Sequence, residues 1–109
     1  MNFIRVTSRT EVLEGKTKKV MVDGKDFLIA NVKGEFYALS NICPHAGGSL
    51  ADGALNGDKI TCPKHGAQFD LKTGAAVGDA KILFFKTKPK NAGCYKVQIN
   101  GTDVMIGVT

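Results

Sequence analysis

The chain has 109 residues, the length of one domain with one core, and 43% of them are apolar, so we expect a globular fold rather than disorder. Its net charge of +5, from 15 Lys and Arg against 10 Asp and Glu, favours docking to an acidic partner. The sequence has no arginine-rich run and no nucleic-acid-binding motif, which argues against DNA or RNA as a partner.

Nothing in the sequence indicates export or a membrane. Charged residues near Met1 interrupt every apolar stretch before it reaches the length of a signal peptide, and no segment is long enough to span a bilayer. Three cysteines, an odd number, are more typical of ligands or nucleophiles in a reducing compartment than of disulfides. We therefore expect a cytoplasmic protein.

Short apolar runs between turn signals predict antiparallel strands along the chain, and helical spacing is nowhere sustained. The first hairpin is "KKVMVDGKDFLIANV", which turns at Asp23-Gly24, a pair that supplies the positive φ angles of a two-residue loop. Lys33-Gly34 predicts the next turn, and later hairpins turn at Asn56-Gly57 and Asn100-Gly101. Further strands are predicted at 68–71, 75–77, 81–87, 94–99 and 103–108.

The strands on either side of residues 41–77 form a β framework, and the middle segment has the character of an insertion that carries the chemistry. We therefore expect an all-β fold with a single domain over residues 1–109 and a small inserted subdomain at 41–77.

Two Cys-Pro turns, "NICPHAGG" and "ITCPKHGA", contain both histidines of the chain and two of its cysteines. The pattern is Cys43-x-His45 followed by Cys62-x-x-His65. Proline fixes its own φ and favours an extended backbone at the preceding cysteine, so each thiolate leaves its strand in a fixed direction. The Asn56-Gly57 hairpin returns the chain so that the two loops can lie side by side. The four side chains are therefore candidate metal ligands.

A structural zinc-binding module with two Cys and two His ligands is one interpretation of this pattern. Zinc motifs typically pair Cys with Cys and His with His, and the finger form places its histidines on a helix. This sequence instead alternates Cys and His on two loops. That order is expected if two metals are bound and each loop gives one ligand to each, so zinc stays the remote alternative.

The two motifs resemble the Rieske-type ferredoxins, whose ligand pattern matches "CPH" and "CPKH" residue by residue over residues 41–70. The resemblance implies a Rieske-type 2Fe-2S cluster, with Cys43 and Cys62 on one iron and His45 and His65 on the other. It also implies a Rieske-like antiparallel β framework with a small inserted cluster-binding subdomain.

By the same resemblance, the protein is a soluble one-electron carrier and not an enzyme. It would pass electrons from a reductase to a terminal oxidoreductase such as an oxygenase. We expect a monomer whose redox partners are acidic at the docking face, with no nucleic-acid or membrane partner. A small redox subunit or redox sensor of a larger enzyme would carry the same motif and is the alternative.

Several positions differ from those of other family members. Membrane members carry one more cysteine in each loop, joined as a disulfide, where this chain has Gly48 and Lys64; it therefore resembles the soluble branch, the small archaeal type included. The same membrane members place serine and tyrosine hydroxyls near the cluster sulfurs, where this chain has Ala67 and Phe69, so we expect a reduction potential in the lower part of the Rieske range. Cys94 is interpreted as a structural residue.

Overall fold

Nearly every regular element of the protein is a β-strand, which confirms the predicted all-β class. The structure, a computed structural model, describes residues 2–42, 48–63, 66–77, 80–82, 85–87 and 91–108. Within these ranges the strands are β1 (Asn2–Ser8), β2 (Thr17–Val22), β3 (Lys25–Val32), β4 (Glu35–Ser40), β5 (Ala54–Asn56), β6 (Lys59–Thr61), β7 (Gln68–Asp70), β8 (Ala80–Ile82), β9 (Phe85–Thr87), β10 (Cys94–Tyr95), β11 (Val97–Asn100) and β12 (Asp103–Val108). Two short 3-10 helices, η1 (Arg9–Glu11) and η2 (Leu50–Asp52), lie between them.

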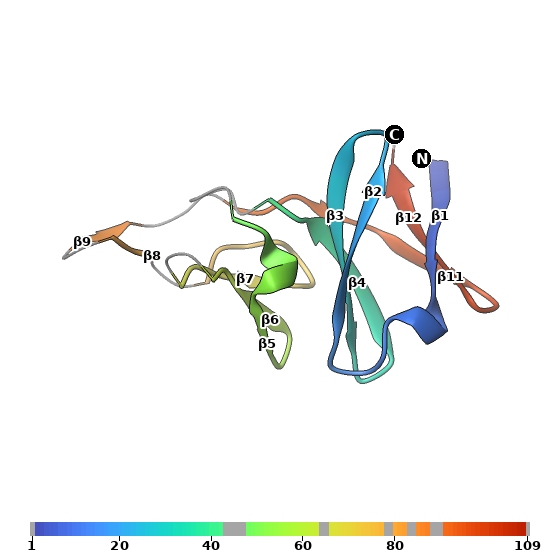
Figure 1. The fold of residues 1–109 in the computed structure, drawn as a ribbon, viewed down its shortest axis with the longest axis horizontal. Helices are drawn as coiled ribbons and strands as arrows, with labels where there is room; N and C mark the ends of the chain where they lie inside the picture. Colours follow the sequence, from blue (N-terminus) through green and yellow to red (C-terminus); the bar gives the residue numbers. More distant parts are fainter. Residues whose placement is uncertain are drawn as a thin grey trace.

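Two antiparallel sheets form the framework (Figure 1). One has the order β1-β12-β11 and the other the order β10-β4-β3-β2. Because β1 pairs with β12, the two ends of the chain lie side by side. A third sheet, β5-β6-β7, lies on the other side of β3 and β4 and is built from residues of the predicted insertion. The small β8-β9 hairpin lies at one end of the molecule.

Strand β3 is buried on both faces, because successive side chains of a strand point to opposite sides of the sheet. Phe27 and Ile29 face the β1-β12-β11 sheet, and Leu28 and Ala30 face the β5-β6-β7 sheet. The length of the chain predicted one core, but the structure has two, because both faces of β3 are covered. The first core comprises Val12, Val20, Phe27, Ile29, Phe36, Ala38, Val104 and Ile106. The second comprises Leu28, Ala30, Leu39, Leu50, Ile60, Cys62, Ala67, Phe69, Leu71 and Ala92. Since full burial of one Leu, Ile or Phe contributes ~1.5–3 kcal/mol, the second core fixes the third sheet firmly on the framework.

The predicted hairpins are present, with local differences. Asp23-Gly24 and Lys33-Gly34 have φ angles of 51°, 78°, 54° and 87°, as the predicted two-residue loops require. In the hairpin after β5, Asn56 pairs with Lys59, so the loop residues are Gly57 and Asp58 rather than the predicted Asn-Gly pair. The hairpin after β11 is shifted in the same way. Glycine accepts positive φ at either loop position, so the Asn-Gly pair alone does not determine the register.

Two predicted single strands are divided in the structure. The segment 94–99 splits between β10, which pairs with β4, and β11, which pairs with β12, so the chain passes from one sheet to the other at Lys96. The segment 81–87 contributes to both β8 and β9, because the chain reverses between Ile82 and Phe85. Alternating or apolar runs predict strands, but they do not show where a strand changes its partner.

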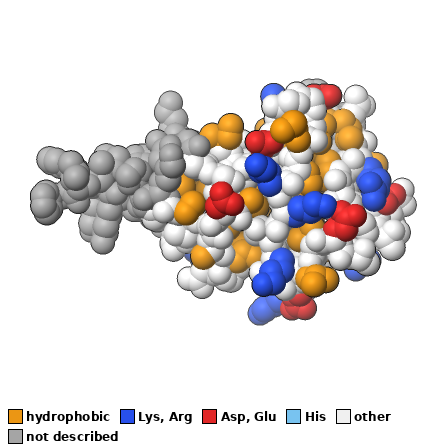
Figure 2. Space-filling model, viewed as in Figure 1, with side chains coloured by type: hydrophobic (Ala, Val, Ile, Leu, Met, Phe, Trp, Pro, Cys, Tyr) orange, Lys and Arg blue, Asp and Glu red, His pale blue; other side chains and the backbone are white. Residues whose placement is uncertain are grey.

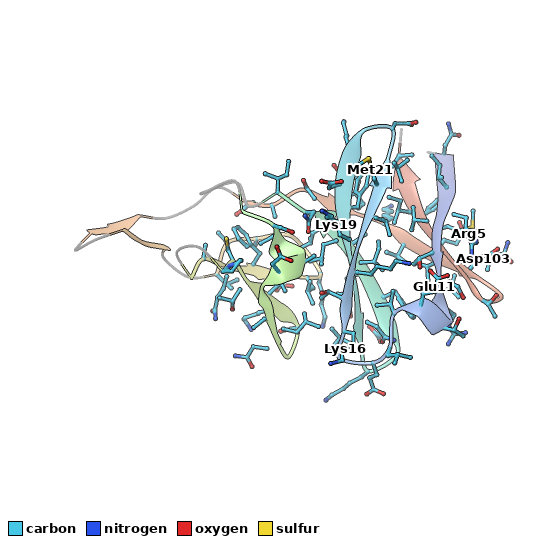
Figure 3. All side chains as sticks on the ribbon, viewed as in Figure 1. Arg5, Glu11, Lys16, Lys19, Met21 and Asp103 are labelled. Carbon is cyan, nitrogen blue, oxygen red and sulfur yellow. The ribbon has the colours of Figure 1, made fainter. Side chains whose placement is uncertain are left out.

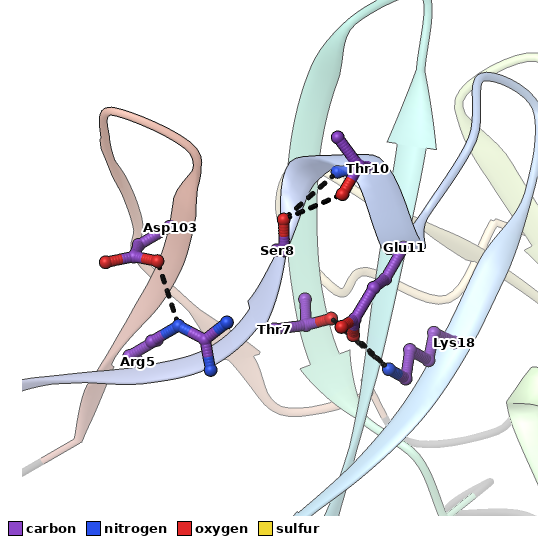
Figure 4. A network of polar contacts seen from close by, with 7 residues as sticks. All are labelled: Arg5, Thr7, Ser8, Thr10, Glu11, Lys18 and Asp103. Carbon is purple, nitrogen blue, oxygen red and sulfur yellow. Dashed lines mark hydrogen bonds and ion pairs between the residues drawn. The ribbon is translucent and has the colours of Figure 1, made fainter.

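A network of polar side chains joins β1, η1 and β2 (Figure 4). Glu11 accepts hydrogen bonds from the buried Thr7 hydroxyl at 2.7 Å and from the Lys18 ammonium at 2.6 Å, and these partners lower the pKa of Glu11. Arg5 forms an ion pair with Asp103 at 2.9 Å between β1 and β12, at the end of the molecule farthest from β8-β9 (Figure 3).

The described surface carries mixed charge. On the face shown in Figure 2, Lys and Arg side chains are interspersed with Asp and Glu over the framework. The edge strand β2 bears Lys19 and the 70% exposed Met21 (Figure 3), and charged side chains on an edge discourage pairing with another chain. Across the described part of the chain, no helix has the length and apolar character needed to cross a membrane.

Candidate metal centre

The structure describes one of the four predicted ligands. Cys43, His45 and His65 lie outside the described residues, and Cys62 directly follows β6. The bases of both predicted ligand loops are described, so the way in which each loop is held can be followed from the framework upward. For the described residues alone, no group of three potential metal ligands is found, since three of the four predicted ligands are not among them.

The second ligand loop joins β6 to β7 and is closed by backbone hydrogen bonds. The Cys62 N–H donates to the Ala67 carbonyl at 2.7 Å, and the Gly66 N–H donates to the Cys62 carbonyl at 3.2 Å. Gly66 has a φ of 75°, a backbone conformation that residues with a Cβ rarely adopt. Both backbone polar groups of Cys62 are therefore fixed by the return of its own loop.

Cys62 is also fixed by packing. It is 1% exposed and belongs to the second core together with the fully buried Ala67 and Phe69. A thiolate ligand at this position is shielded from water, and the low dielectric of such a site strengthens its attraction to a cation. Burial, a fixed backbone and a thiol donor all fit a metal–sulfur site, so the described part of the site accommodates the predicted group.

The first ligand loop leaves β4 and returns into η2. Ile42 and Ser49 form an isolated antiparallel bridge, and the Leu50 N–H donates to the Asn41 carbonyl at 2.8 Å. These contacts bring the two ends of the loop together, with its predicted ligands, Cys43 and His45, between them.

The two loop bases lie next to each other. Gly53 follows η2, and a Cβ at this position would lie 1.8 Å from the carbonyl oxygen of Thr61, the residue before Cys62. Leu50, just past the first loop, is fully buried in the same core as Cys62. The close approach of the two loop bases agrees with the side-by-side arrangement expected from the sequence, and the meeting of all four ligands stays a prediction.

One residue at the site, Asn41, stands out only in the structure. Asn41 is 2% exposed and bonds across the first loop, and the signal in the sequence was an Asn and a Ser at the two ends of the loop.

The Cys94 thiol donates to the Lys72 carbonyl at 3.3 Å, which joins β10 to the turn after β7. Partial burial and the nearby Asp70 carboxylate raise the pKa of Cys94, so the thiolate is disfavoured and the structural interpretation is supported.

Comparison with known proteins identifies the family. The sequence profile of the Rieske [2Fe-2S] domain matches residues 2–89. The chain belongs to the Rieske [2Fe-2S] domain family. Its cofactor is accordingly a Rieske-type 2Fe-2S cluster, in which two histidines replace two cysteines on one iron.

Rieske ferredoxins resemble this chain over its full length. It is 34% identical to the ferredoxin component of the naphthalene 1,2-dioxygenase system of Pseudomonas putida, over 100% of this chain and 98% of the relative. The ferredoxin of carbazole 1,9a-dioxygenase from Nocardioides aromaticivorans IC177 superposes with a TM-score of 0.84 at 26% identity, over 100% of both chains. A structure of reduced oxygenase with oxidized ferredoxin in carbazole 1,9a-dioxygenase matches with the same TM-score and identity, over 95% of this chain and 91% of the matched one.

Proposed function

We propose that this protein is the ferredoxin component of an oxygenase system, a one-electron carrier that accepts electrons from a reductase and passes them to a terminal oxygenase. The observation that carries the proposal is the end-to-end correspondence with a dioxygenase ferredoxin component, 34% identical over 100% of this chain and 98% of the relative. A related ferredoxin forms a complex with an oxygenase, which supports an oxygenase as the terminal partner. The chain is an electron-transfer component rather than a catalyst.

Cys43 and Cys62 would bind one iron, and His45 and His65 the other. When bound, the cluster supplies one reversible electron. Two thiolates balance the charge of +2 on an oxidised 2Fe-2S core, whereas four would leave a negative site, so mixed ligation eases reduction. Cys62 would hold its thiolate in a fixed place, because both of its backbone groups are bonded and it is 1% exposed. That rigidity is what rapid electron transfer requires of a ligand.

We further propose a cytoplasmic monomer that forms transient complexes. The net charge of +5 supports redox partners with acidic docking faces, because opposite charges steer association. The mixture of charges on the framework face in Figure 2 is consistent with a docking surface elsewhere on the molecule. A carrier that serves two partners in turn must leave each one, and steering raises the association rate without a large buried interface.

The test begins with the visible spectrum and the iron and sulfide content of the purified protein. We expect a coloured protein with two irons and two sulfides, whose colour is lost in each of the variants Cys43→Ala, His45→Ala, Cys62→Ala and His65→Ala, while Cys94→Ala keeps it. Reduction by a ferredoxin reductase and turnover of a dioxygenase in the reconstituted system would establish the carrier. A colourless protein that holds one zinc would refute the cluster assignment, and tight copurification with a large subunit would favour a bound redox subunit.

A further inference from the structure

Asn41 is a buried polar residue at the start of the first ligand loop. It directly follows β4, precedes Cys43 by two positions and is 2% exposed. Each of its polar groups forms a hydrogen bond: the N–H to the Asp26 carbonyl (3.0 Å), the carbonyl from the Leu50 N–H (2.8 Å), Oδ1 from the Ala51 N–H (2.9 Å) and Nδ2 to the Ser49 hydroxyl (2.9 Å). Buried polar groups favour one arrangement when all are satisfied, because any other arrangement leaves an unpaired group away from water.

Three of these four bonds cross the loop. Ser49, Leu50 and Ala51 are the residues through which the chain returns from the first ligand loop into η2. The Asn41 amide therefore bonds to the residues on either side of Leu50: Nδ2 donates to the Ser49 hydroxyl, and Oδ1 accepts from the Ala51 N–H. The Ile42–Ser49 bridge closes the loop at the next position, so a side chain and a backbone contact act together at the loop base.

The loop base is anchored to the central sheet on both sides. The Asn41 N–H bonds to Asp26 on β3, and the Thr17 hydroxyl on β2 donates to the Ala51 carbonyl at 3.4 Å. Leu50, between the two residues that Asn41 binds through its side chain, is fully buried in the core that contains Cys62. The position of the first loop relative to Cys62 thus depends on bonds that converge on Asn41.

We propose that Asn41 is a positioning residue of the metal centre: its side-chain amide clasps the two ends of the first ligand loop and so sets the position of Cys43 and His45 relative to Cys62. The inference rests on the proposed function, because that function assigns the ligands. It concerns how the ligands are held. Without the clasp, the loop has several arrangements of similar energy, and the bound iron is both less tightly held and less uniform in its ligand geometry.

Asn31 provides a matched control in the same sheet. It is 7% exposed on β3, its Nδ2 donates to the Val12 carbonyl at 2.8 Å, and its Oδ1 accepts from the Gly34 N–H at 2.9 Å. Both asparagines therefore use one donor and one acceptor of a buried amide to fasten a loop. None of the Asn31 partners belongs to residues 41–77. Removal of either amide costs similar stability, and only Asn41 is placed to affect the cluster.

The experiment compares the parent, Asn41→Ala, Asn41→Asp, Ser49→Ala and Asn31→Ala as cluster-loaded proteins. The readouts are the denaturant midpoint, the rate of iron release to a chelator, the electron paramagnetic resonance spectrum of the reduced protein and its potential. We expect Asn41→Ala and Asn31→Ala to lose similar stability. Of these two, only Asn41→Ala should release iron faster, by about tenfold if the clasp contributes ~1.4 kcal/mol, and show a broadened, shifted resonance spectrum.

The two partial variants separate the halves of the clasp. Ser49→Ala removes the bond made by Nδ2 and keeps the bond to Ala51, whereas Asn41→Asp keeps the acceptor for Ala51 and replaces Nδ2 by an oxygen to which the Ser49 hydroxyl has to donate. Both should fall between the parent and Asn41→Ala in iron release. If Asn41→Ala fails to assemble, Ser49→Ala decides: a parental release rate and spectrum there would overturn the proposal.

Two further outcomes would also overturn the proposal. One is an Asn41→Ala protein with parental spectrum, potential and release rate despite its lower stability. The other is an Asn31→Ala protein with the same spectral change. Hydrogen exchange at the Leu50 and Ala51 amides tests the clasp independently of the metal, and it should accelerate in Asn41→Ala but not in Asn31→Ala. If the parent holds zinc, the proposed function fails, and hydrogen exchange still tests whether the Asn41 side chain holds the loop base together.

Discussion

The two ligand loops are closed at their bases by different kinds of bond. The second is closed by the backbone: Cys62 and Ala67 pair directly, as a continuation of the β6-β7 ladder. The first has the isolated Ile42–Ser49 bridge and one backbone bond from the Leu50 N–H to the Asn41 carbonyl, and the Asn41 side chain adds two more bonds. Backbone bonds are available to any sequence that forms the hairpin, whereas two of the bonds at the first loop base need the amide side chain of Asn41. Its geometry is therefore more vulnerable to a single substitution.

The contact between the two loop bases is the most sensitive point of this arrangement. A Cβ at Gly53 would lie 1.8 Å from the Thr61 carbonyl oxygen, a backbone atom that cannot rotate away, although the φ of −86° is ordinary for any residue. We expect Gly53→Ala to separate η2 from β6 and to lower the free energy of unfolding by ~1–3 kcal/mol. Denaturant unfolding and iron release measure both effects.

Gly93→Ala is the control for this substitution, because the nearest atom to its new Cβ lies at 3.4 Å, an ordinary contact. It should change stability by no more than ~0.5 kcal/mol. Equal stability of the Gly53→Ala variant and the parent would show that the two bases need not touch.

Ala67 connects the backbone closure of the second loop to the predicted potential. It is fully buried in the core that contains Cys62. A hydroxyl donor aimed at a cluster sulfur bonds more strongly to the reduced state, since hydrogen bonds to charged acceptors are the stronger ones. We expect Ala67→Ser to raise the potential by ~40 mV, which corresponds to ~1 kcal/mol for one electron.

Protein-film voltammetry measures that shift. Phe69→Tyr is the less suitable substitution. Phe69 is fully buried, so the added phenol hydroxyl needs both space and a hydrogen-bond partner. If the Ala67→Ser protein kept its cluster and the reduction potential of the parent, hydroxyl groups in the second loop could not explain how the potential is set.

A side-chain bond also spans the second loop base, and it should matter less than the clasp of the first. The Gln68 amide donates to the Thr61 hydroxyl at 3.2 Å beside an existing backbone pair. We expect Gln68→Ala to cost ~0.5–1 kcal/mol in unfolding free energy and to leave iron release unchanged. Iron release as fast as that of Asn41→Ala would contradict the contrast between the loops.

The smallest effect is expected for the polar network around Glu11, far from the ligand loops. Its contribution to stability depends on pH. Lys18 and Thr7 lower the pKa of Glu11, whose ordinary value is 4.5, so its carboxylate stabilises the folded state above that pH. The contribution is lost as the pH falls through the lowered value. In Glu11→Gln this part of the acid sensitivity should disappear. Denaturant midpoints of both proteins between about pH 7 and about pH 3 test it, and parallel curves would contradict it.

The sequence by itself determined the features that local chemistry dictates. Asp23-Gly24 and Lys33-Gly34 adopt the positive φ angles that their hairpins need, and the alternating runs form the strands of an antiparallel all-β fold. The paired "CPH" and "CPKH" motifs were enough to predict the Rieske family, because this order of ligands on two loops suits few other metal sites. Ligation by Cys43, His45, Cys62 and His65 stays a prediction, and three of these four residues lie outside the described residues. The bounds 41–77 of the inserted subdomain also stay a prediction.

Other features were decided only by the tertiary structure. The segment 94–99 had one strand-like pattern, but its pairing with two sheets depends on where β4 and β12 lie. The clasp of Asn41 could not be predicted, because a polar residue beside a loop is ordinarily solvated, and it becomes decisive only when η2 and β3 bury it. Local propensities act over a few residues, whereas burial and hydrogen-bond satisfaction depend on segments that meet only in the folded chain.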